Sequence, residues 1–277
     1  NNGSSDLPID LYVSGSHNQN NVTISSIPQN NYYLAGNPYI KTISWVDISK
    51  TNLSSVVSVW DDASTDWKTY NGISGDLTNG LIAPFQGFWV QAIGGVGSFT
   101  IQPDDIASSS TSFVRSNNGN NSSFIKLSFS NGYKNDEIFF TFDSLGSKGF
   151  DHKDAPKLSP LTKSPRIAAM IISEGLTYKI NNLPSHYDSL MTFPLQILSL
   201  DLHSSGKILG MQDTLSLSVD ELNLPININF DIYDSFTGIR YDADQLYGLS
   251  IITESLDSLN FDLNGPLNQY SNYGNHR

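Results

Sequence analysis

The chain has 277 residues, with no Cys and only five His. Carboxylates are therefore the main candidates for catalytic or metal-binding side chains. The lack of Cys excludes disulfides, thiol catalysis and thiolate metal sites. No two His residues have the i, i+4 spacing of a zinc-binding helix, and neither H-E-x-x-H nor G-x-S-x-G occurs. Three kinds of chemistry remain to be weighed: catalysis by paired carboxylates, calcium binding, and sugar binding by aromatic rings.

A carboxylate pair could hydrolyse glycosides if two side chains faced each other across a cleft at about 5–10 Å. Glu is scarce in this chain, and most Asp residues lie in turn-like segments, where their side chains bond nearby backbone. The Glu residues are Glu137, Glu174, Glu221 and Glu254. We therefore predict that the chain is not an enzyme, and keep a hydrolase as the least favoured alternative.

Closely spaced Asp residues offer the hard oxygen ligands that Ca²⁺ prefers. Of these residues, Asp151 and Asp154 are the metal-ligand candidates, although no segment matches the D-x-[DN]-x-[DN]-G calcium loop. The alternative is that these carboxylates cap turns. We expect no obligatory cofactor and leave Ca²⁺ binding open.

All four Trp residues fall in the first 105 residues, which permits a carbohydrate-binding surface there. The candidate ligand-binding residues are Trp60, Trp67 and Tyr70, and Trp67 is expected to be the most exposed because its neighbours are polar. A coplanar, exposed aromatic pair would favour sugar binding. The alternative is core packing, since aromatic side chains bury large areas.

The sequence predicts that β-strands form the framework that carries these residues. Apolar and polar residues alternate with period two in four segments, which places one face of each strand in a core and the other in water. These segments are Phe124–Ser130, Asp213–Val219, Ile226–Asp234 and Ser258–Leu263. Ile167–Ile172 is apolar on both faces and is predicted to be a central strand. The best helical candidate, Ser218–Leu222, is one turn long. We predict an all-β chain of two β-sandwich-like domains, built from antiparallel strands with little helix.

The expected domain order follows composition. Residues 1–105 form a β-rich module with further strands expected at 9–13, 21–27, 32–35, 55–60, 87–92 and 98–101. Residues 106–123 are rich in Asp, Ser, Asn and Gly and form a linker or crossover. Residues 124–264 form the β-sandwich domain, and residues 265–277 form a loose tail. The polar start without an initiator Met leads us to expect a piece of a longer chain.

The charge balance excludes some partners. With 15 Lys and Arg against 27 Asp and Glu, the formal net charge is −12. Such a surface repels nucleic-acid phosphates and anionic lipid. No run of about 18 apolar residues occurs, so we also expect no membrane insertion.

Two blocks in the first part of the chain are distinctive: Y-L-A-G-N-P-Y at 33–39, followed by I-S-W at 43–45, and I-A-P-F-Q-G-F-W-V-Q-A at 82–92. Together they resemble the GNPY … PGQGFWV module of large secreted Bacteroidetes proteins, which lies shortly before the C-terminal sorting domain of the type IX secretion system. The chain departs from this pattern at Phe85, where the family often has Gly, and at Ile40, where a second Pro is usual.

The second part of the chain continues the resemblance. Its blocks include N-D-E at 135–137, G-F-D at 149–151, D-A-P-K-L at 154–158, the segment 176–184 and a hairpin within 230–249. The sorting domain itself is missing after Leu263. The resemblance implies an extracellular or outer-surface location, and contact with the type IX secretion machinery through the parent protein. It supplies no catalytic residues.

Four D-[ST]-x sites match the O-glycan acceptor of Bacteroidetes. The hydroxyls concerned are those of Ser144, Ser189, Thr214 and Ser258. The alternative is that these sites are plain turns at strand ends.

We therefore expect a non-catalytic structural or adhesive module, glycosylated in its exported form, of a secreted or cell-surface bacterial protein. Its partners would be glycans or other surface proteins. The alternative is a carbohydrate-binding module of a secreted polysaccharide-degrading enzyme.

Overall fold

The chain has an all-β fold, as the alternating sequence pattern predicts. The computed structural model describes residues 14–107, 123–161, 164–186, 190–202, 204, 208–222, 224–225, 228–234 and 237–253. Within these residues the regular elements are β-strands and three short 3-10 helices. In this described part, no helix has the length and apolar character needed to cross a membrane.

The N-terminal half, residues 14–107, contains two main sheets. One has the strand order β1-β9-β4 and the other β2-β8-β5-β6, and β3 pairs with β7. The elements are β1 (Val22–Ile27), β2 (Tyr32–Gly36), β3 (Ile43–Ser44), β4 (Ser49–Thr51), β5 (Val57–Asp61), β6 (Asp66–Tyr70), η2 (Thr78–Gly80), β7 (Leu81–Ile82), β8 (Gly87–Gln91), β9 (Gly97–Ile101) and η3 (Pro103–Asp105).

Three aromatic rings form the centre of this half. Trp45 lies 5.9 Å, between ring centroids, from both Phe88 and Phe99. The indole N–H of Trp45 donates to the carbonyl of Ser55 at 2.8 Å, so its only polar atom is satisfied inside the core.

Asn37 connects the two distinctive sequence blocks of the N-terminal half. Its buried side-chain amide donates to the carbonyls of Ile82 at 3.2 Å and Ala83 at 2.9 Å, and its Oδ1 accepts from the backbone N–H of Tyr39 at 3.0 Å. The G-N-P-Y turn and the P-F-Q-G turn are therefore one packed unit, held by a residue that needs both a donor and an acceptor.

The C-terminal half, which is described between residues 123 and 253, is dominated by one large sheet. Its strand order is β16-β15-β13-β14-β11-β10-β17-β20, with β12 paired to β14, and β18 and β19 form a separate hairpin. The elements are β10 (Phe124–Ser130), β11 (Asn135–Asp143), β12 (Ala155–Pro156), β13 (Arg166–Ser173), β14 (Leu176–Pro184), β15 (Leu195–Leu202), β16 (Ile208–Met211), β17 (Asp213–Leu222), β18 (Asp231–Asp234), β19 (Ile239–Asp242), η4 (Ala243–Gln245) and β20 (Leu249–Thr253).

Strand β13 lies between β15 and β14 and is buried on both faces. Ile167, Ala169 and Ile171 belong to the main core, whereas Ala168 and Met170 belong to a second cluster on the opposite face. The expectation of a central strand at Ile167–Ile172 is confirmed.

Some strand predictions are wrong in detail. Ser218–Leu222 is not a helical turn but the end of β17, because its backbone pairs with β10 along the register from Ser218↔Ser128 to Leu222↔Phe124. Sheet pairing of this kind overrides weak local propensity. Not every strand pair is antiparallel, since β11 and β14 run parallel. Residues 9–13 and 258–263 lie outside the described residues, as do 226 and 227.

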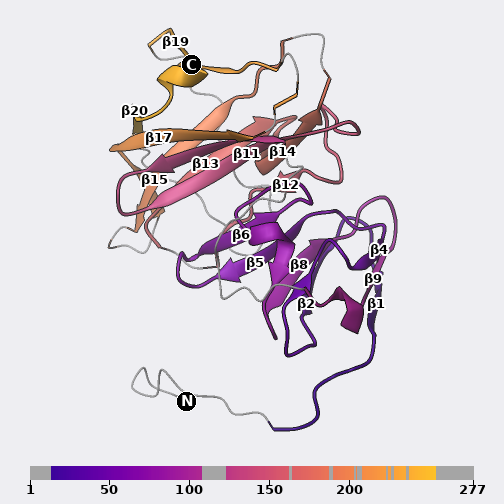
Figure 1. The fold of residues 1–277 in the computed structure, drawn as a ribbon. Helices are drawn as coiled ribbons and strands as arrows, with labels where there is room; N and C mark the ends of the chain where they lie inside the picture. The colour runs from indigo at the N-terminus through magenta and orange to yellow at the C-terminus, as the bar shows by residue number, and fades with distance from the viewer. Residues whose placement is uncertain are drawn as a thin grey trace.

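The two halves pack against each other, with β5, β6 and β12 near the junction (Figure 1). Val56 packs on an apolar cluster of the C-terminal half that contains Phe124 and Phe139. The first two residues of the expected linker belong to the N-terminal half, since Ile106 bridges to Ile43 and the Ala107 N–H donates to Thr42. Residues 108–122 are outside the described part, and the proposed domain boundaries stay a prediction.

Candidate functional site

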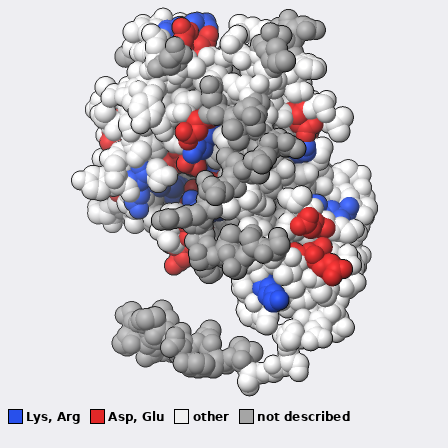
Figure 2. Space-filling model, in the orientation of Figure 1, with Lys and Arg blue, Asp and Glu red and all other residues white. Residues whose placement is uncertain are grey.

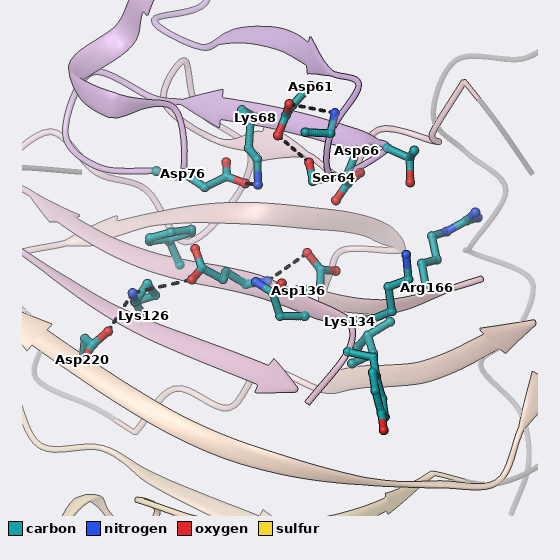
Figure 3. A pocket seen from close by; sticks show the side chains of 18 of the residues that line it. Asp61, Ser64, Asp66, Lys68, Asp76, Lys126, Lys134, Asp136, Arg166 and Asp220 are labelled. Atoms are coloured by element: carbon teal, nitrogen blue, oxygen red, sulfur yellow. Dashed lines mark hydrogen bonds and ion pairs between the residues drawn. The ribbon is translucent and has the colours of Figure 1, made fainter. Parts of the chain in front are cut away.

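A cleft of about 780 Å³ lies between the two halves. The β5–β6 hairpin and the loop 74–76 form one wall, and β10, β11 and the start of β13 form the other (Figure 3). The charged residues that line it are Asp61, Asp66, Lys68, Asp76, Lys126, Lys134, Asp136, Glu137, Arg166 and Asp220.

Lys179 of β14 joins the halves beneath this cleft. Its side chain is 3% exposed, and its Nζ donates to the backbone carbonyl of Trp67 at 2.9 Å and to Oδ2 of Asp76 at 2.6 Å. The other Asp76 oxygen accepts from the backbone N–H of Thr69 at 2.7 Å, and Lys68 Nζ lies 3.6 Å from Oδ2. The Asp76 carboxylate thus lies between two lysines that come from different halves.

A second buried ion pair lies in the opposite wall. Lys157 donates to Oδ2 of Asp136, and both side chains are buried. Asp136 also accepts from the backbone N–H groups of Ala169 and Glu137, each at 2.8 Å. The carboxylate therefore has three donors, which compensate the cost of burying its charge.

The electrostatics couple these pairs into one network. Burial lowers the pKa of Lys179, but the nearby Asp76, Asp66 and Asp136 outweigh it, so that its pKa is raised above the ordinary value. Burial raises the pKa of Asp66, but Lys179, Lys157 and Lys68 outweigh it, so that its pKa is lowered. Both groups are therefore held in their charged forms, and the network alternates in sign across the interface.

The remaining cleft carboxylates also have partners. Lys126 lies 2.7 Å from Asp220 and 3.6 Å from Glu137. Asp61 accepts from the Ala63 N–H at 3.1 Å and from the Ser64 hydroxyl at 2.7 Å, which closes the β5–β6 turn. A glycosidase needs one carboxylic acid with a raised pKa. In Asp66 the network produces the opposite shift.

The aromatic candidates do not form the expected platform. Trp67 is 6% exposed, so the expectation that it is the most exposed ring is wrong. The β5–β6 register places it opposite Trp60, and its indole N–H donates to the Ser159 carbonyl of the C-terminal half at 2.8 Å. The two rings meet at 71° with centroids 5.3 Å apart, and so are not coplanar. Trp60 and Tyr70 are partly buried, and ligand binding through them stays a prediction.

Asp151 and Asp154 shape a loop with their carboxylates. Asp154 accepts from the N–H groups of Asn182 at 2.6 Å and Asp151 at 2.7 Å, and Asp151 accepts from those of Ser147 and Lys153. Burial raises the pKa of Asp154 to about 7, against the effect of its two backbone donors. Among the described residues no group of three or more His, Asp or Glu is arranged to hold a metal ion. Calcium binding by the two residues stays a prediction.

The same loop contacts the N-terminal half through its backbone. The His152 carbonyl accepts from the Ser55 N–H at 2.8 Å and the Ser54 hydroxyl at 2.9 Å. The Lys153 carbonyl accepts from the Asn71 side chain at 2.9 Å. The carboxylates of the D-x-x-D segment thus fix a loop that binds the other half.

Two of the four expected glycan acceptors can be located. Ser144 and Thr214 are exposed, whereas Ser189 and Ser258 lie outside the described residues. The Asp143 carboxylate accepts from the Leu145 N–H at 2.7 Å, so this site is a side-chain-closed turn. Accessibility permits modification at Ser144 and Thr214, and the assignment stays a prediction.

Sequence reasoning missed the buried lysines. In the structure Lys179 stands in a strand whose residues from Thr177 to Leu183 are all buried, but four of these seven residues are polar, so the sequence gives no sign of this burial. A lysine within such a run requires a buried carboxylate partner. The sequence does not reveal that this partner is Asp76, which comes 103 residues earlier.

Comparison of the chain with protein-family models, with curated proteins and with solved structures gives no match. The functional conclusions therefore depend on the residues and their geometry.

Proposed function

We propose that the chain is a non-catalytic structural module of a secreted or cell-surface bacterial protein, in which two β-rich halves act as one rigid unit. The observation that carries this proposal is the buried ion network around Lys179 and Asp76, which connects the halves beneath the cleft.

Buried ion pairs favour a single relative orientation, because a shifted interface would leave charges desolvated and unpaired. Neighbouring domains usually move relative to one another unless their interface is extensive. Here the ion network is joined by the Trp67 indole bond to Ser159, by the bonds to the His152 carbonyl and by the packing of Val56. These contacts suit a spacer or adhesive segment that transmits force without bending.

The exported location is supported by the resemblance of the G-N-P-Y and P-F-Q-G-F-W-V blocks to the type IX secretion substrates. In this proposal the parent protein passes through that secretion machinery, and the module meets glycans or other surface proteins outside the cell. Antibodies against the folded chain should label intact cells of the source bacterium, and external protease should remove the label. Label that appears only after lysis would contradict an exported location.

The structural role is tested by pulling single molecules between residues 14 and 253. The two halves are expected to unfold in one event, because the interface ruptures together with the sheets. The matched variant Lys179→Met, which removes the central cation, should split this event into two. Two separate low-force events in the unchanged protein would contradict the proposed rigid unit.

A carbohydrate-binding module remains the second candidate. Trp67 is buried and no longer supports it, which leaves Trp60 and Tyr70 as the aromatic candidates of the original prediction.

A further inference from the structure

The cleft between the halves is polar, and its charges balance. In the described part of the chain, six carboxylates and four cations line it. Two further lysines, Lys157 and Lys179, are ion-paired to the lining residues Asp136 and Asp76. The summed charge is therefore zero, although the whole chain carries −12.

The charges are balanced between neighbouring side chains as well as in the sum over the cleft. Lys126 is shared between Glu137 and Asp220, and Asp76 is shared between Lys68 and Lys179. On the face shown in Figure 2, acidic and basic atoms lie beside each other in several places. A charged ligand would have to displace these internal partners, whereas a hydroxyl group can donate to a carboxylate and accept from an ammonium at the same time.

Tyr133 lines the cleft, but its aromatic ring is not packed in a core. It lies at the tip of the β10–β11 hairpin and is 93% exposed. The turn itself is rigid, since Asn131 Oδ1 accepts from the N–H groups of Tyr133 at 3.1 Å and Lys134 at 2.9 Å. The exposed ring therefore extends from a hydrogen-bonded turn, and exposed tyrosine rings on loops are a feature of binding surfaces.

We propose that this cleft binds a neutral oligosaccharide, with the Tyr133 ring stacked on the apolar face of one sugar and the paired charges bonded to its hydroxyls. The cleft volume lies within the roughly 300–1,000 Å³ of ligand-binding pockets. Its polar lining suits a hydroxyl-rich ligand rather than an apolar one. This inference does not depend on the structural role proposed above.

Isothermal titration with cellohexaose, xylohexaose, mannohexaose and chitohexaose tests the proposal. At least one of these neutral sugars is expected to bind the unchanged protein. Tyr133→Ala should weaken that binding roughly five- to tenfold, in line with the loss of one aromatic contact. The matched control is Tyr247→Ala, which removes a tyrosine that is 82% exposed and does not line the cleft. This variant should bind the sugar with the affinity of the unchanged protein.

Polygalacturonate serves as the charged probe, and thermal melting checks that each variant is folded. The proposal is overturned if none of the four hexasaccharides binds at millimolar concentration, or if polygalacturonate binds more tightly than all of them. It is also overturned if Tyr133→Ala and Tyr247→Ala bind alike. Asn135→Ala, which truncates another exposed lining residue, gives an independent readout and should weaken binding about threefold.

Discussion

The Nζ atom of Lys179 lies 2.6 Å from Oδ2 of Asp76, and the two residues belong to different halves of the molecule. The lysine is on β14, in the middle of the large sheet, and the aspartate is in the loop that follows β6. The Lys179 side chain is 3% exposed and the Asp76 side chain 9%, and the pair is bonded further to the Trp67 carbonyl and the Thr69 N–H. It therefore couples the folding of one half to the position of the other.

Replacing Lys179 with Met should destabilise the protein strongly. The change removes the cation that is bonded to Asp76 and leaves this carboxylate with the Thr69 N–H and the more distant Lys68 as partners, and breaking a buried pair in this way costs about 3–5 kcal/mol. Urea denaturation followed by tryptophan fluorescence measures the change in the free energy of unfolding.

The matched control is Lys126→Met, because Lys126 also has two carboxylate partners but is 25% exposed in its side chain. Its loss should be about 1 kcal/mol or less, since water screens the pair. Equal losses in the two variants would show that the buried network has no special role.

The sequence predicts the framework of the C-terminal half well, because burial imposes a period that can be read directly. Ile125, Leu127 and Phe129 alternate and face the main core, and β13 is apolar on both faces because it is central. Both patterns depend only on which face of a strand meets water.

The site could not be predicted in the same way, because its residues meet through the packing of the halves. Trp67 has polar neighbours in the sequence, yet its ring is buried in the structure. Its indole N–H donates to the Ser159 carbonyl, which belongs to the other half. Similarly, Asp136 and Lys157 belong to the N-D-E and D-A-P-K-L blocks, but nothing in these blocks shows that the two side chains form a buried pair, which arises only when β12 joins β14. Local sequence carries no information about a partner from a distant segment.

Phe85→Gly should stabilise the protein. Phe85 has a backbone φ of 60°, in the left-handed region that disfavours residues with a Cβ, and its side chain is 70% exposed. The resembling secreted proteins often have Gly at this position, which suits that backbone conformation. Removing the penalty should raise the free energy of unfolding by about 1 kcal/mol, measured by urea denaturation.

The control for this change is Val46→Gly, at an apolar residue that is 52% exposed and is not among the positive-φ positions. At this position glycine should lower the free energy of unfolding by about 0.5–1 kcal/mol, because it increases the conformational entropy of the unfolded chain and relieves no strain in the folded one. If Phe85→Gly also loses stability, the phenylalanine makes a contribution that outweighs its backbone strain.

O-glycans are expected on Ser144 and Thr214 in protein isolated from its natural source. Both residues are exposed and follow an aspartate in a D-[ST]-L segment. Peptide mass spectrometry should find a mass increase on the peptides that contain them and none on the peptide of residues 42–50, which contains Ser44, 8% exposed, and no D-[ST] site. Unmodified peptides at both expected sites would remove the assignment.

Asp154 should make the protein more stable in mild acid than at alkaline pH. Burial raises the pKa of its carboxyl from 3.8 to about 7 in the folded state, so between these values the folded chain binds a proton that the unfolded chain lacks. This contribution is fully present below pH 3.8 and is lost as pH rises through about 7. The free energy of unfolding should therefore fall with rising pH across this window, by at most about 1.4 kcal/mol per pH unit, and level off above it.

The change is isolated by subtracting the stability curve of Asp154→Asn from that of the unchanged protein, measured by urea denaturation from pH 4.5 to 8.5. The amide offers one acceptor where two backbone N–H groups need one each, so the variant loses one hydrogen bond, and this loss does not itself depend on pH. Its curve should lack the fall between pH 4.5 and 7, because the variant has no proton to release at this site. Asp62→Asn, at an exposed residue, should retain the fall. If Asp154→Asn retains it as well, the backbone donors of Asn182 and Asp151 outweigh burial, and the carboxylate stays charged throughout this range.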